Sequence, residues 1–423
     1  MRLLISSLHY TPESTGNAPY TTGLAEHLAS RGHSVTVITG FPSYPTWRVR
    51  ASHRWLLWKR ETICGIDVHR RWHYVPGRQS AIRRGLSEGS FLITSLSAMA
   101  LPRPDIVLGI VPSLGGGLLA RLAASRFRVP YGLIFQDLMG PAAEQSGVGS
   151  AGWVGGIVRG AEGWAARSAG AIGIIAEGFR PYIESLGVDP DRIQHVRNWT
   201  HIQEPVLDRA TMRERLGLPQ DAVLCLHAGN MGYKQGLENI VECARLAADV
   251  DGKLHFVLMG DGNQRSGLET LAARYDLPNL RLLPIQPDDL FPSILAAADI
   301  LLVNQRASIT DMSLPSKLTS YFAAARPVVA AVAPTSEAAR EIEASGAGIL
   351  ATPDDPDALL SALQALADSS ARRMQLGGSA RIWAKTRLSQ ETAMEDYERL
   401  LAAVLASGSS VTTQAQDPLN ART

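Results

Sequence analysis

The feature that most constrains the fold of this chain is a regular alternation between short apolar runs and longer segments of helical period. In the first half, the runs are β-branched or apolar almost throughout, which is typical of strands buried on both faces of a sheet. The runs cover residues 3–8, 35–39, 106–110, 131–135 and 171–176, and helical intervals such as 20–30 and 117–125 lie between them. The alternation predicts a parallel sheet with helices on both faces.

The same alternation starts again in the second half of the chain. Strand-like runs there cover residues 223–228, 254–259, 280–283, 300–304 and 327–331, with helical intervals at 237–248, 267–275 and 316–325. A polar stretch over 198–208 separates the two series, and after Pro353 the pattern is helical only. We therefore predict an α/β protein with two doubly wound, parallel-sheet domains.

The expected domain boundaries follow from these changes of pattern. The N-terminal domain covers 1–200 and the C-terminal domain 201–387. A last helix over about 388–406 could pack back on the N-terminal domain. The residues after it, 407–423, are mostly small and polar, and we expect a disordered tail there.

Charge and cysteine content narrow the possible partners. The chain has 41 Lys and Arg against 40 Asp and Glu, a formal net charge of +1, which argues against a nucleic-acid-binding protein that depends on phosphate neutralisation. The three cysteines lack the CxxC spacing of a zinc site, so we expect them to be core residues in a reducing compartment. Two Asp-x-Asp strings, at 189–191 and 249–251, lie in turns between helices and strands, and we expect no metal at either.

Hydropathy bears on localisation. No apolar stretch approaches the length of about 20 residues that a membrane-spanning helix needs. The first residues run directly into a polar loop and do not resemble a secretion signal. We expect a cytoplasmic protein that is either soluble or attached to the inner face of the plasma membrane.

Glycine-containing loops follow several of the predicted strands. In the first domain, Gly16 and Asn17 stand between a strand and the start of a helix. Glycine lets backbone approach a ligand closely, and the free N–H groups of a helix N-terminus favour an anion such as a diphosphate. The loop does not match the G-x-G-x-x-G dinucleotide motif, which disfavours a nicotinamide-dependent oxidoreductase.

Three further loops of this kind occur in the second domain, at 227–236, 259–263 and 314–318. The carboxyl ends of parallel strands meet at one edge of a sheet, where open α/β sheets bind ligands. Lysine side chains and backbone N–H groups in such loops are suited to phosphate. The candidate phosphate-binding residues in these loops are Gly229, Asn230, Gly232, Lys234, Gly260, Gly262, Ser316 and Lys317.

Taken together, these motifs resemble those of the retaining GT-B glycosyltransferases of family 4, and within them the exopolysaccharide enzymes of the colanic-acid WcaI and WbuB type. The matching segments, which spread over about residues 2–400, are 16–17, 31–39, 135–138, 229–236, 260–262, 315–318 and 326–329. The resemblance implies two Rossmann-like domains that face a cleft. It also implies that a sugar is transferred from a nucleotide-diphosphate sugar with retention at the anomeric carbon, without a metal or other cofactor.

The resemblance also implies roles for individual residues. Lys234 would neutralise the leaving diphosphate, Lys317 would be a second cation on the donor, and Asn230 stands where many relatives have arginine. Gln136 and Asp137 lie near the place where relatives often carry a histidine that contacts the donor sugar, and Asp137 could hold a sugar hydroxyl or the acceptor. Stabilisation of a departing phosphate by fixed charges is usually the largest catalytic effect available to such a site.

One departure from the family pattern concerns a pair of glutamates, E-x7-E, whose second member holds the nucleotide ribose in many relatives. The corresponding positions here are Ser320 and the region of Met312, and neither is acidic. Glu337 or Glu341, which follow the next strand, could contact the donor instead. The departure leaves the identity of the donor open.

A basic and aromatic segment spans residues 47–84. It contains ten Lys or Arg and two acidic residues, set among Trp47, Trp55, Trp58 and Trp72. Cations for anionic headgroups and indoles at the boundary are typical of a membrane-surface anchor. Such an anchor suits the polyprenyl-diphosphate-linked acceptor that the resemblance implies. Packing of the segment on its own domain, or RNA binding, are the alternatives.

We therefore expect a glycosyltransferase that adds a sugar to a lipid-linked glycan acceptor in surface or exopolysaccharide biosynthesis. Two alternatives share the fold. One is an epimerase or hydrolase that acts on a nucleotide sugar and would need acid–base groups in its cleft. The other is a non-catalytic subunit that binds a sugar nucleotide without turnover. The donor base, the sugar and the linkage depend on pocket shape, which motifs do not specify.

Overall fold

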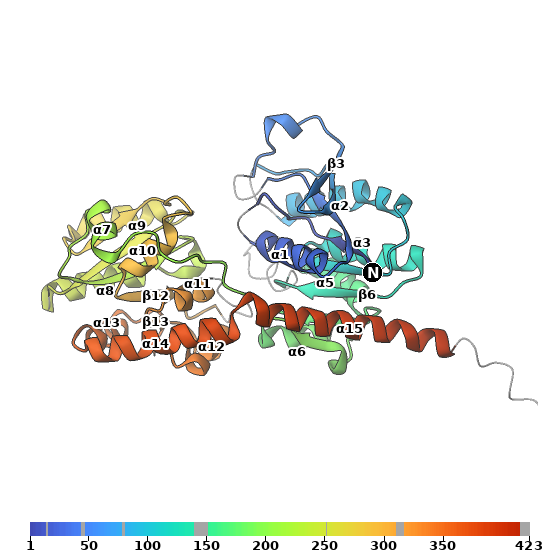
Figure 1. The fold of residues 1–423 in the computed structure, drawn as a ribbon. Coiled ribbons are helices and arrows are strands. Elements are labelled where there is room, and N and C mark those ends of the chain that lie inside the picture. The colour runs from blue at the N-terminus through green and yellow to red at the C-terminus, as the bar shows by residue number, and fades with distance from the viewer. Residues whose placement is uncertain are drawn as a thin grey trace, which may run out of the picture. The chain divides into compact units, whose positions relative to one another are not determined.

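A computed structural model of the chain describes residues 1–13, 16–43, 47–77, 81–138, 151–250, 252–309 and 317–414. The chain forms two compact units (Figure 1). Unit 1 contains Met1–Asn198 and the chain from Glu391 onward, and unit 2 contains Trp199–Gln390. Each unit has one sheet with helices around it, so the prediction of two α/β domains with parallel sheets is confirmed.

Unit 1 has an eight-stranded sheet in the order β3-β4-β2-β1-β5-β6-β7-β8. All pairs are parallel except β3 with β4, which form an antiparallel pair at one edge. The strands are β1 (Arg2–Ser6), β2 (Ser34–Gly40), β3 (Trp58–Ile63), β4 (Ile66–Arg71), β5 (Ile106–Val111), β6 (Tyr131–Phe135), β7 (Ala171–Ile174) and β8 (Ile193–His195). The central strands β5, β6 and β7 are buried along their whole length, as expected for apolar runs covered on both faces.

The helices of unit 1 connect these strands. The helices are α1 (Ala18–Ser30), α2 (Ala81–Ser95), α3 (Leu114–Phe127), α5 (Ala151–Ala166), α6 (Arg180–Ser185) and α15 (Gln390–Gln414), with short 3₁₀ turns η1 (Ala51–His53), η2 (Leu96–Ala100), η3 (Glu177–Phe179) and η4 (Pro190–Arg192). Helix α3 begins directly after Ser113, whose side chain accepts a hydrogen bond from the N–H of Gly116 and caps the helix.

The last helix, α15, packs on unit 1 although it follows unit 2 in the sequence. Asp396, which is almost fully buried, pairs with Arg197 at 2.8 Å. His27 Nε2 on α1 lies 2.9 Å from Glu398 Oε1. These contacts tie residues some 200 and 370 positions apart in the chain into one compact unit.

The end of α15 differs from the sequence-based expectation. Residues 407–414 continue the helix instead of forming part of a disordered tail. Ser407 Oγ donates to Val404 O at 2.7 Å, and Gly408 packs against Pro130. Contact with the N-terminal unit therefore supports helical structure in residues whose composition alone disfavours it.

Unit 2 has a six-stranded sheet, parallel throughout, in the order β11-β10-β9-β12-β13-β14. Its strands are β9 (Val223–Ala228), β10 (Leu254–Met259), β11 (Leu280–Leu283), β12 (Ile300–Asn304), β13 (Val328–Ala331) and β14 (Gly348–Ala351). Its helices are α7 (Arg209–Arg215), α8 (Glu238–Val250), α9 (Arg265–Tyr275), α10 (Phe291–Ala297), α11 (Lys317–Ala323), α12 (Glu337–Ser345), α13 (Pro356–Ala367) and α14 (Ser370–Arg387), with the 3₁₀ turn η5 (Tyr233–Gln235).

Two hydrophobic cores fill the two faces of this sheet. On β9, Leu224 and Leu226 belong to one core and Cys225 to the other, which is the alternation expected of a strand. The first core includes side chains from α7, α10, α11, α12 and α14, and the second is built mainly from α8, α9 and α13. The loops at the carboxyl ends of the strands are thus held on a rigid, doubly covered sheet.

Candidate active site

Two of the glycine turns in unit 2 contact each other directly. A glycine follows the last residue of β9 and of β10, and the N–H of Gly229 donates to the carbonyl of Met259 at 2.9 Å. Gly260 has a φ of 152°, and a Cβ atom there would lie 1.8 Å from Gly229 O. Only glycine fits at position 260, because any side chain would collide with the neighbouring turn.

The next residues of the two turns extend this contact. The N–H of Met231 donates to the carbonyl of Asp261 at 2.8 Å. A Cβ atom at Gly262 would lie 2.5 Å from Met231 O, and one at Gly232 would lie 2.9 Å from Asn230 Nδ2. The structure therefore brings together the glycines and the asparagine that the sequence singles out, with the asparagine side chain exposed.

Lys317 supplies a cation at this cluster. Its Nζ lies 3.4 Å from His227 Nε2 and next to Gly229, where a Cβ atom would be 3.6 Å from it. Burial lowers the pKa of Lys317 to about 8, and no carboxylate of the described residues pairs with it. Burial, with the Lys317 ammonium as a second cause, lowers the pKa of His227 well below its usual value, so this imidazole is neutral. A partly buried ammonium that has no carboxylate partner among the described residues is suited to an anionic ligand.

Lys234 lies on the same loop as Gly229, in the turn η5. Its carbonyl accepts a hydrogen bond from Arg306 N at 3.0 Å, and the Arg306 guanidinium pairs with Glu238 at 2.9 Å. The same guanidinium stacks 4.3 Å from the centre of the Tyr233 ring. The backbone of the loop is therefore fixed, while the side chain of Lys234 is exposed.

The two glutamates that could replace the family pair lie on α12, after β13. Glu337 is the first residue of this helix; it is buried and pairs with Arg340. Glu341 accepts a hydrogen bond from Trp383 Nε1 at 2.6 Å, which engages it in packing against α14. Of these two glutamates, only Glu337 lies at the carboxyl edge of the sheet. Among the described residues, its ion pair is with Arg340 and not with a residue of the glycine turns.

The second position of the missing glutamate pair, Ser320, is a buried residue of α11. Its neighbour Tyr321 is also buried, and its hydroxyl accepts a hydrogen bond from the N–H of Ala228 at 2.9 Å, which anchors α11 to the end of β9. Met312 and Ser316 lie outside the described residues.

In unit 1, Gly16 and Asn17 lie between β1 and α1. Gly16 has a φ of 67°, in the left-handed region that favours glycine. Asn17 is 9% exposed, its carbonyl accepts from the N–H of Thr21, and its Nδ2 has no hydrogen-bond partner among the described residues. An unsatisfied buried donor at this place is available to a ligand.

Gln136 and Asp137 follow β6. The amide of Gln136 is engaged within unit 1: its Oε1 accepts from Asn198 Nδ2 at 2.8 Å, and its Nε2 lies 3.2 Å from the Tyr397 hydroxyl. Asp137 Oδ1 accepts a hydrogen bond from the N–H of Leu138 at 2.8 Å. Gln136 thus links β6 to α15, and the carboxylate of Asp137 supports its own loop.

Two residues of the unit 2 cluster have no role in the sequence analysis. His227 touches Lys317, and Arg265, the first residue of α9, donates to the carbonyls of Gly260 and Leu283. The only sequence signal for His227 is its place in an apolar run, two residues before Gly229. Arg265 carries no distinctive signal, because an exposed helix start often has a charged residue.

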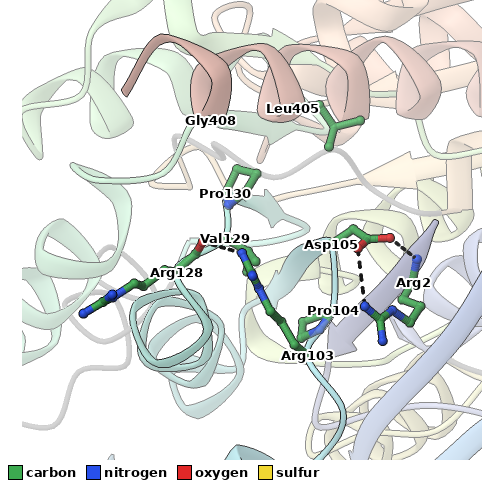
Figure 2. A pocket seen from close by; sticks show the side chains of 9 residues that line it. All are labelled: Arg2, Arg103, Pro104, Asp105, Arg128, Val129, Pro130, Leu405 and Gly408. Carbon is green, nitrogen blue, oxygen red and sulfur yellow. Dashed lines mark hydrogen bonds and ion pairs between the residues drawn. The ribbon is translucent and has the colours of Figure 1, made fainter. Parts of the chain in front are cut away.

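A pocket of about 450 Å³ lies at the opposite, amino edge of the unit 1 sheet (Figure 2). Arg2 contacts Asp105 through its backbone N–H at 2.7 Å and its guanidinium at 3.9 Å, and Arg103 donates to the carbonyl of Arg128 (Figure 2). The remaining lining residues are Pro104, Val129, Pro130, Leu405 and Gly408. None of the predicted site residues lines this pocket.

Metal sites and membrane spans are absent from the described part of the chain. It contains no group of three or more His, Cys, Asp or Glu side chains arranged to hold a metal ion. Asp189 instead caps η4 by accepting from the N–H of Asp191 at 3.1 Å, and Asp251 lies outside the described residues. None of the described helices combines the length and the hydropathy of a membrane-spanning helix.

The basic and aromatic segment 47–84 forms η1, the β3–β4 hairpin and the start of α2. Trp55 is 88% exposed and Trp58 67%. The N–H of Trp72 donates to the carbonyl of Leu57, and Thr94 of α2 donates to the carbonyl of Trp72, so α2 lies beside the hairpin. The exposed apolar side chains of this region, which we call the apolar strip, are Trp55, Leu56, Leu57, Trp58, Trp72, Ile82, Leu86, Ile93 and Leu96.

The cations of this segment differ in exposure from what the sequence suggests. Arg70 and Arg71 are buried, and Arg70 pairs with Glu61 at 2.5 Å. They hold the edge of the sheet and cannot contact an external surface. The exposed arginines of the segment are Arg48, Arg50, Arg54, Arg60, Arg83 and Arg84.

Comparison with known families and proteins identifies the chain. Residues 15–199 match the family described as glycosyl transferase 4-like domain, and residues 208–383 match glycosyl transferases group 1. The chain is 31% identical over 379 residues to the colanic acid biosynthesis glycosyl transferase WcaI of Escherichia coli (strain K12), covering 86% of this chain and 91% of that protein. The chain belongs to the GT-B glycosyltransferases of family 4. The resemblance predicted from the motifs is confirmed.

Solved structures agree with this fold. Sucrose-phosphate synthase from Thermosynechococcus elongatus superposes with a TM-score of 0.73 at 17% identity, covering 96% of this glycosyltransferase and 99% of that chain. Anabaena HepE in complex with UDP-glucose gives 0.64 at 14% identity, covering 98% and 100%. WaaG, a glycosyltransferase of lipopolysaccharide biosynthesis, gives 0.65 at 15% identity, covering 95% and 99%. At these identities the likeness shows the fold alone.

Proposed function

We propose that this glycosyltransferase moves a sugar from a nucleotide-diphosphate sugar to a lipid-linked glycan acceptor in the biosynthesis of a surface polysaccharide. Two similar proteins support the proposal: WcaI, a glycosyl transferase of colanic acid biosynthesis, and HepE, whose structure contains UDP-glucose. The observation that carries it is the ammonium of Lys317, which has no carboxylate partner among the described residues and lies against turns where only glycine fits.

The chemistry follows from this arrangement. When the bond between the anomeric carbon and the diphosphate oxygen breaks, negative charge grows on the leaving phosphate. The Lys317 ammonium and the exposed Lys234 would stabilise that charge. A bound diphosphate would also raise the pKa of Lys317 from about 8, because a nearby anion favours the charged form.

We further propose that the reaction retains the anomeric configuration and needs no metal. In the mechanism that the family resemblance suggests, the leaving phosphate oxygen accepts the proton of the acceptor hydroxyl while the new glycosidic bond forms on the same face of the sugar. The two lysines would take the place of a divalent cation on the diphosphate. Chelator should then leave the rate unchanged.

The apolar strip supports peripheral attachment of unit 1 to an anionic membrane. Exposed indoles beside exposed arginines are suited to the boundary between headgroups and acyl chains. Such attachment would place the enzyme on the inner face of the plasma membrane, where it meets a polyprenyl-diphosphate-linked acceptor. Without a membrane or a partner, these side chains would form a large apolar surface in contact with water, which is unusual for a soluble protein.

The experiment that tests the proposed reaction is an incubation of the purified protein with UDP-, GDP-, ADP- and dTDP-sugars and an extract of lipid-linked glycans, followed by mass spectrometry of all products. Transfer predicts a glycan that is heavier by one sugar and an equal amount of free nucleoside diphosphate. Release of free sugar in place of the glycan product would identify a hydrolase, and an isomeric nucleotide sugar would identify an epimerase. Binding of a donor without any product would contradict an enzymatic function.

A further inference from the structure

Asn304, the last residue of β12, has a buried side chain at the carboxyl edge of the unit 2 sheet. Its Nδ2 donates to the carbonyls of Gln235 and Gly236, at 2.7 and 2.9 Å. Its Oδ1 accepts from Nδ2 of Asn239, on α8, at 2.9 Å. The carboxamide therefore joins the end of β12 to the last residues of the loop that follows β9 and to the start of the next helix.

The backbone at Gly236 lies directly against the residues that end β12. Gly236 has a φ of 53°, in the left-handed region that favours glycine. Its carbonyl accepts a second hydrogen bond, from the N–H of Asn239 at 3.1 Å. A Cβ atom at position 236 would lie 2.8 Å from Cγ of Arg306 and 3.5 Å from Nδ2 of Asn304. Glycine at this position thus allows the loop to approach both side chains closely.

Arg306, two residues after β12, contacts the same loop. Its backbone N–H donates to the carbonyl of Lys234 at 3.0 Å, and its Nε donates to the carbonyl of Tyr233 at 2.8 Å. Its guanidinium also stacks on the Tyr233 ring and pairs with Glu238, the first residue of α8. The planar guanidinium makes these contacts in fixed directions, which a lysine ammonium does not reproduce.

The four successive carbonyls of residues 233–236 therefore all accept hydrogen bonds from Asn304 or Arg306. The end of β12 that carries these two residues is itself fixed, because the N–H of Gln305 donates to the carbonyl of Ala331 in β13 at 2.9 Å. Lys234 lies within the run that is held in this way. A displacement of about 1 Å in a group that orients a substrate can cost about a hundredfold in rate, so the placement of this backbone has a direct consequence for catalysis.

We propose that Asn304 and Arg306 are positioning residues that hold the backbone of residues 233–236 so that the Lys234 ammonium meets the leaving diphosphate. The inference rests on the proposed function, because it takes the role of Lys234 from there, and it adds the two side chains that set the place of this lysine. Both act through Lys234 and not through a contact of their own with the donor.

A double-mutant cycle separates positioning of Lys234 from a general effect on stability. Asn304→Asp keeps the size of the side chain and replaces the donor Nδ2 by an oxygen that the two loop carbonyls repel. We expect this change to lower kcat/KM for the donor sugar about ten- to a hundredfold when Lys234 is present, and less than about twofold in the Lys234→Ala protein. Arg306→Gln, a change at a partly exposed side chain, should lower kcat/KM about tenfold with the same dependence on Lys234.

Asn279 provides the matched control within the same sheet. It directly precedes β11, at the amino edge, and its Nδ2 donates to the carbonyl of Ala244 at 2.9 Å. Asn279→Asp thus removes the same kind of hydrogen bond far from the glycine turns. We expect both Asp variants to lower the melting temperature, whereas Asn279→Asp should leave kcat/KM within about twofold of the wild type.

Calorimetric titration of the same proteins with UDP, GDP, ADP and dTDP adds a readout that does not need turnover. The affinity for the nucleoside diphosphate that binds the wild type should show the same dependence on Lys234. Equal losses with and without Lys234, or wild-type kinetics and affinity in both Asn304→Asp and Arg306→Gln, would overturn the inference. If Asn304→Asp does not fold, Arg306→Gln decides.

The outcomes also distinguish this inference from the proposed function. A wild-type protein that binds a nucleoside diphosphate but transfers no sugar from any donor would contradict the proposed reaction, and the coupling in nucleotide affinity would still support or overturn the positioning role. Absence of binding by all four nucleotides would overturn both.

Discussion

The carboxyl edges of the two sheets are formed by different kinds of residues. In unit 2 the edge is made of glycine turns that exclude side chains, with the Lys317 ammonium beside them. In unit 1 the corresponding edge holds buried carboxylates and histidines, among them Glu13 and His73. The first arrangement is suited to an anionic ligand, whereas the second places carboxylates where an anion would be repelled. One architecture, repeated in a chain, thus places different kinds of residues in the loops after its strands.

The largest effect is expected from filling the unit 2 turns. Gly260→Ala would place a Cβ atom 1.8 Å from Gly229 O in a backbone conformation that alanine rarely adopts. We expect loss of nucleotide binding and destabilisation of about 3 kcal/mol or more. Gly267→Ala on α9, where a Cβ atom meets nothing within 4 Å, is the control, and urea unfolding with a nucleotide-binding assay measures both. Equal behaviour of the two variants would show that the turns are not tightly packed.

The next effect concerns Lys234. Lys234→Ala should lower kcat/KM by about two to three orders of magnitude with the fold intact, if its ammonium stabilises the leaving diphosphate. Steady-state kinetics with the preferred donor sugar measure it. Lys385→Ala, an exposed lysine of α14, serves as control. Near-normal kinetics of Lys234→Ala would remove this residue from the donor site.

A smaller effect concerns the free energy of unfolding, which the partly buried ammonium of Lys317 lowers. Its pKa is lowered to about 8 in the folded protein, against about 10.4 when unfolded, so the unfolded chain binds more protons between these values. Lys317→Met should therefore raise the melting temperature in the absence of nucleotide. The gain should be full below about pH 8 and vanish above about pH 10.4. A gain that does not depend on pH would mean that packing, and not the buried charge, is responsible.

The smallest effect is expected at the apolar strip of unit 1. Neutralising Arg48, Arg50 and Arg54 should weaken sedimentation with vesicles of anionic phospholipid by about 1 kcal/mol for each arginine. Arg372, Arg381 and Arg387 of α14 in unit 2, which are also exposed, provide a matched triple control. If the triple variant of η1 and the control sediment alike, the strip has a role other than binding an anionic membrane.

The sequence predicts the fold of this chain well because its strands are central and apolar. The runs at 106–110 and 131–135 correspond closely to β5 and β6, since a strand covered on both faces needs apolar residues along its whole length. The edge strands β3 and β4 lack that signal. β3 alternates between exposed and half-buried residues, and β4 ends in two arginines that the composition assigns to the surface.

The candidate site is predictable only in part. Glycines 229, 260 and 262 are visible in the sequence, because turns after parallel strands meet at one edge. The pairing of Lys317 with His227 depends on the packing of α11 against β9, through Tyr321, and no local pattern contains it. The contact of Gln136 with Tyr397 depends on α15, which is more than 250 residues away in the chain, and its contact with Asn198 joins residues 62 positions apart.

The most direct test of the account is a thermal-shift titration of the wild type, Lys317→Ala and Lys385→Ala with UDP, GDP, ADP and dTDP. A ligand that binds only the folded state raises the melting temperature by mass action. We predict that one nucleoside diphosphate stabilises the wild type and Lys385→Ala equally and stabilises Lys317→Ala much less. No shift with any of the four, or an equal shift in all three proteins, would contradict the assignment of the diphosphate to the glycine turns and Lys317.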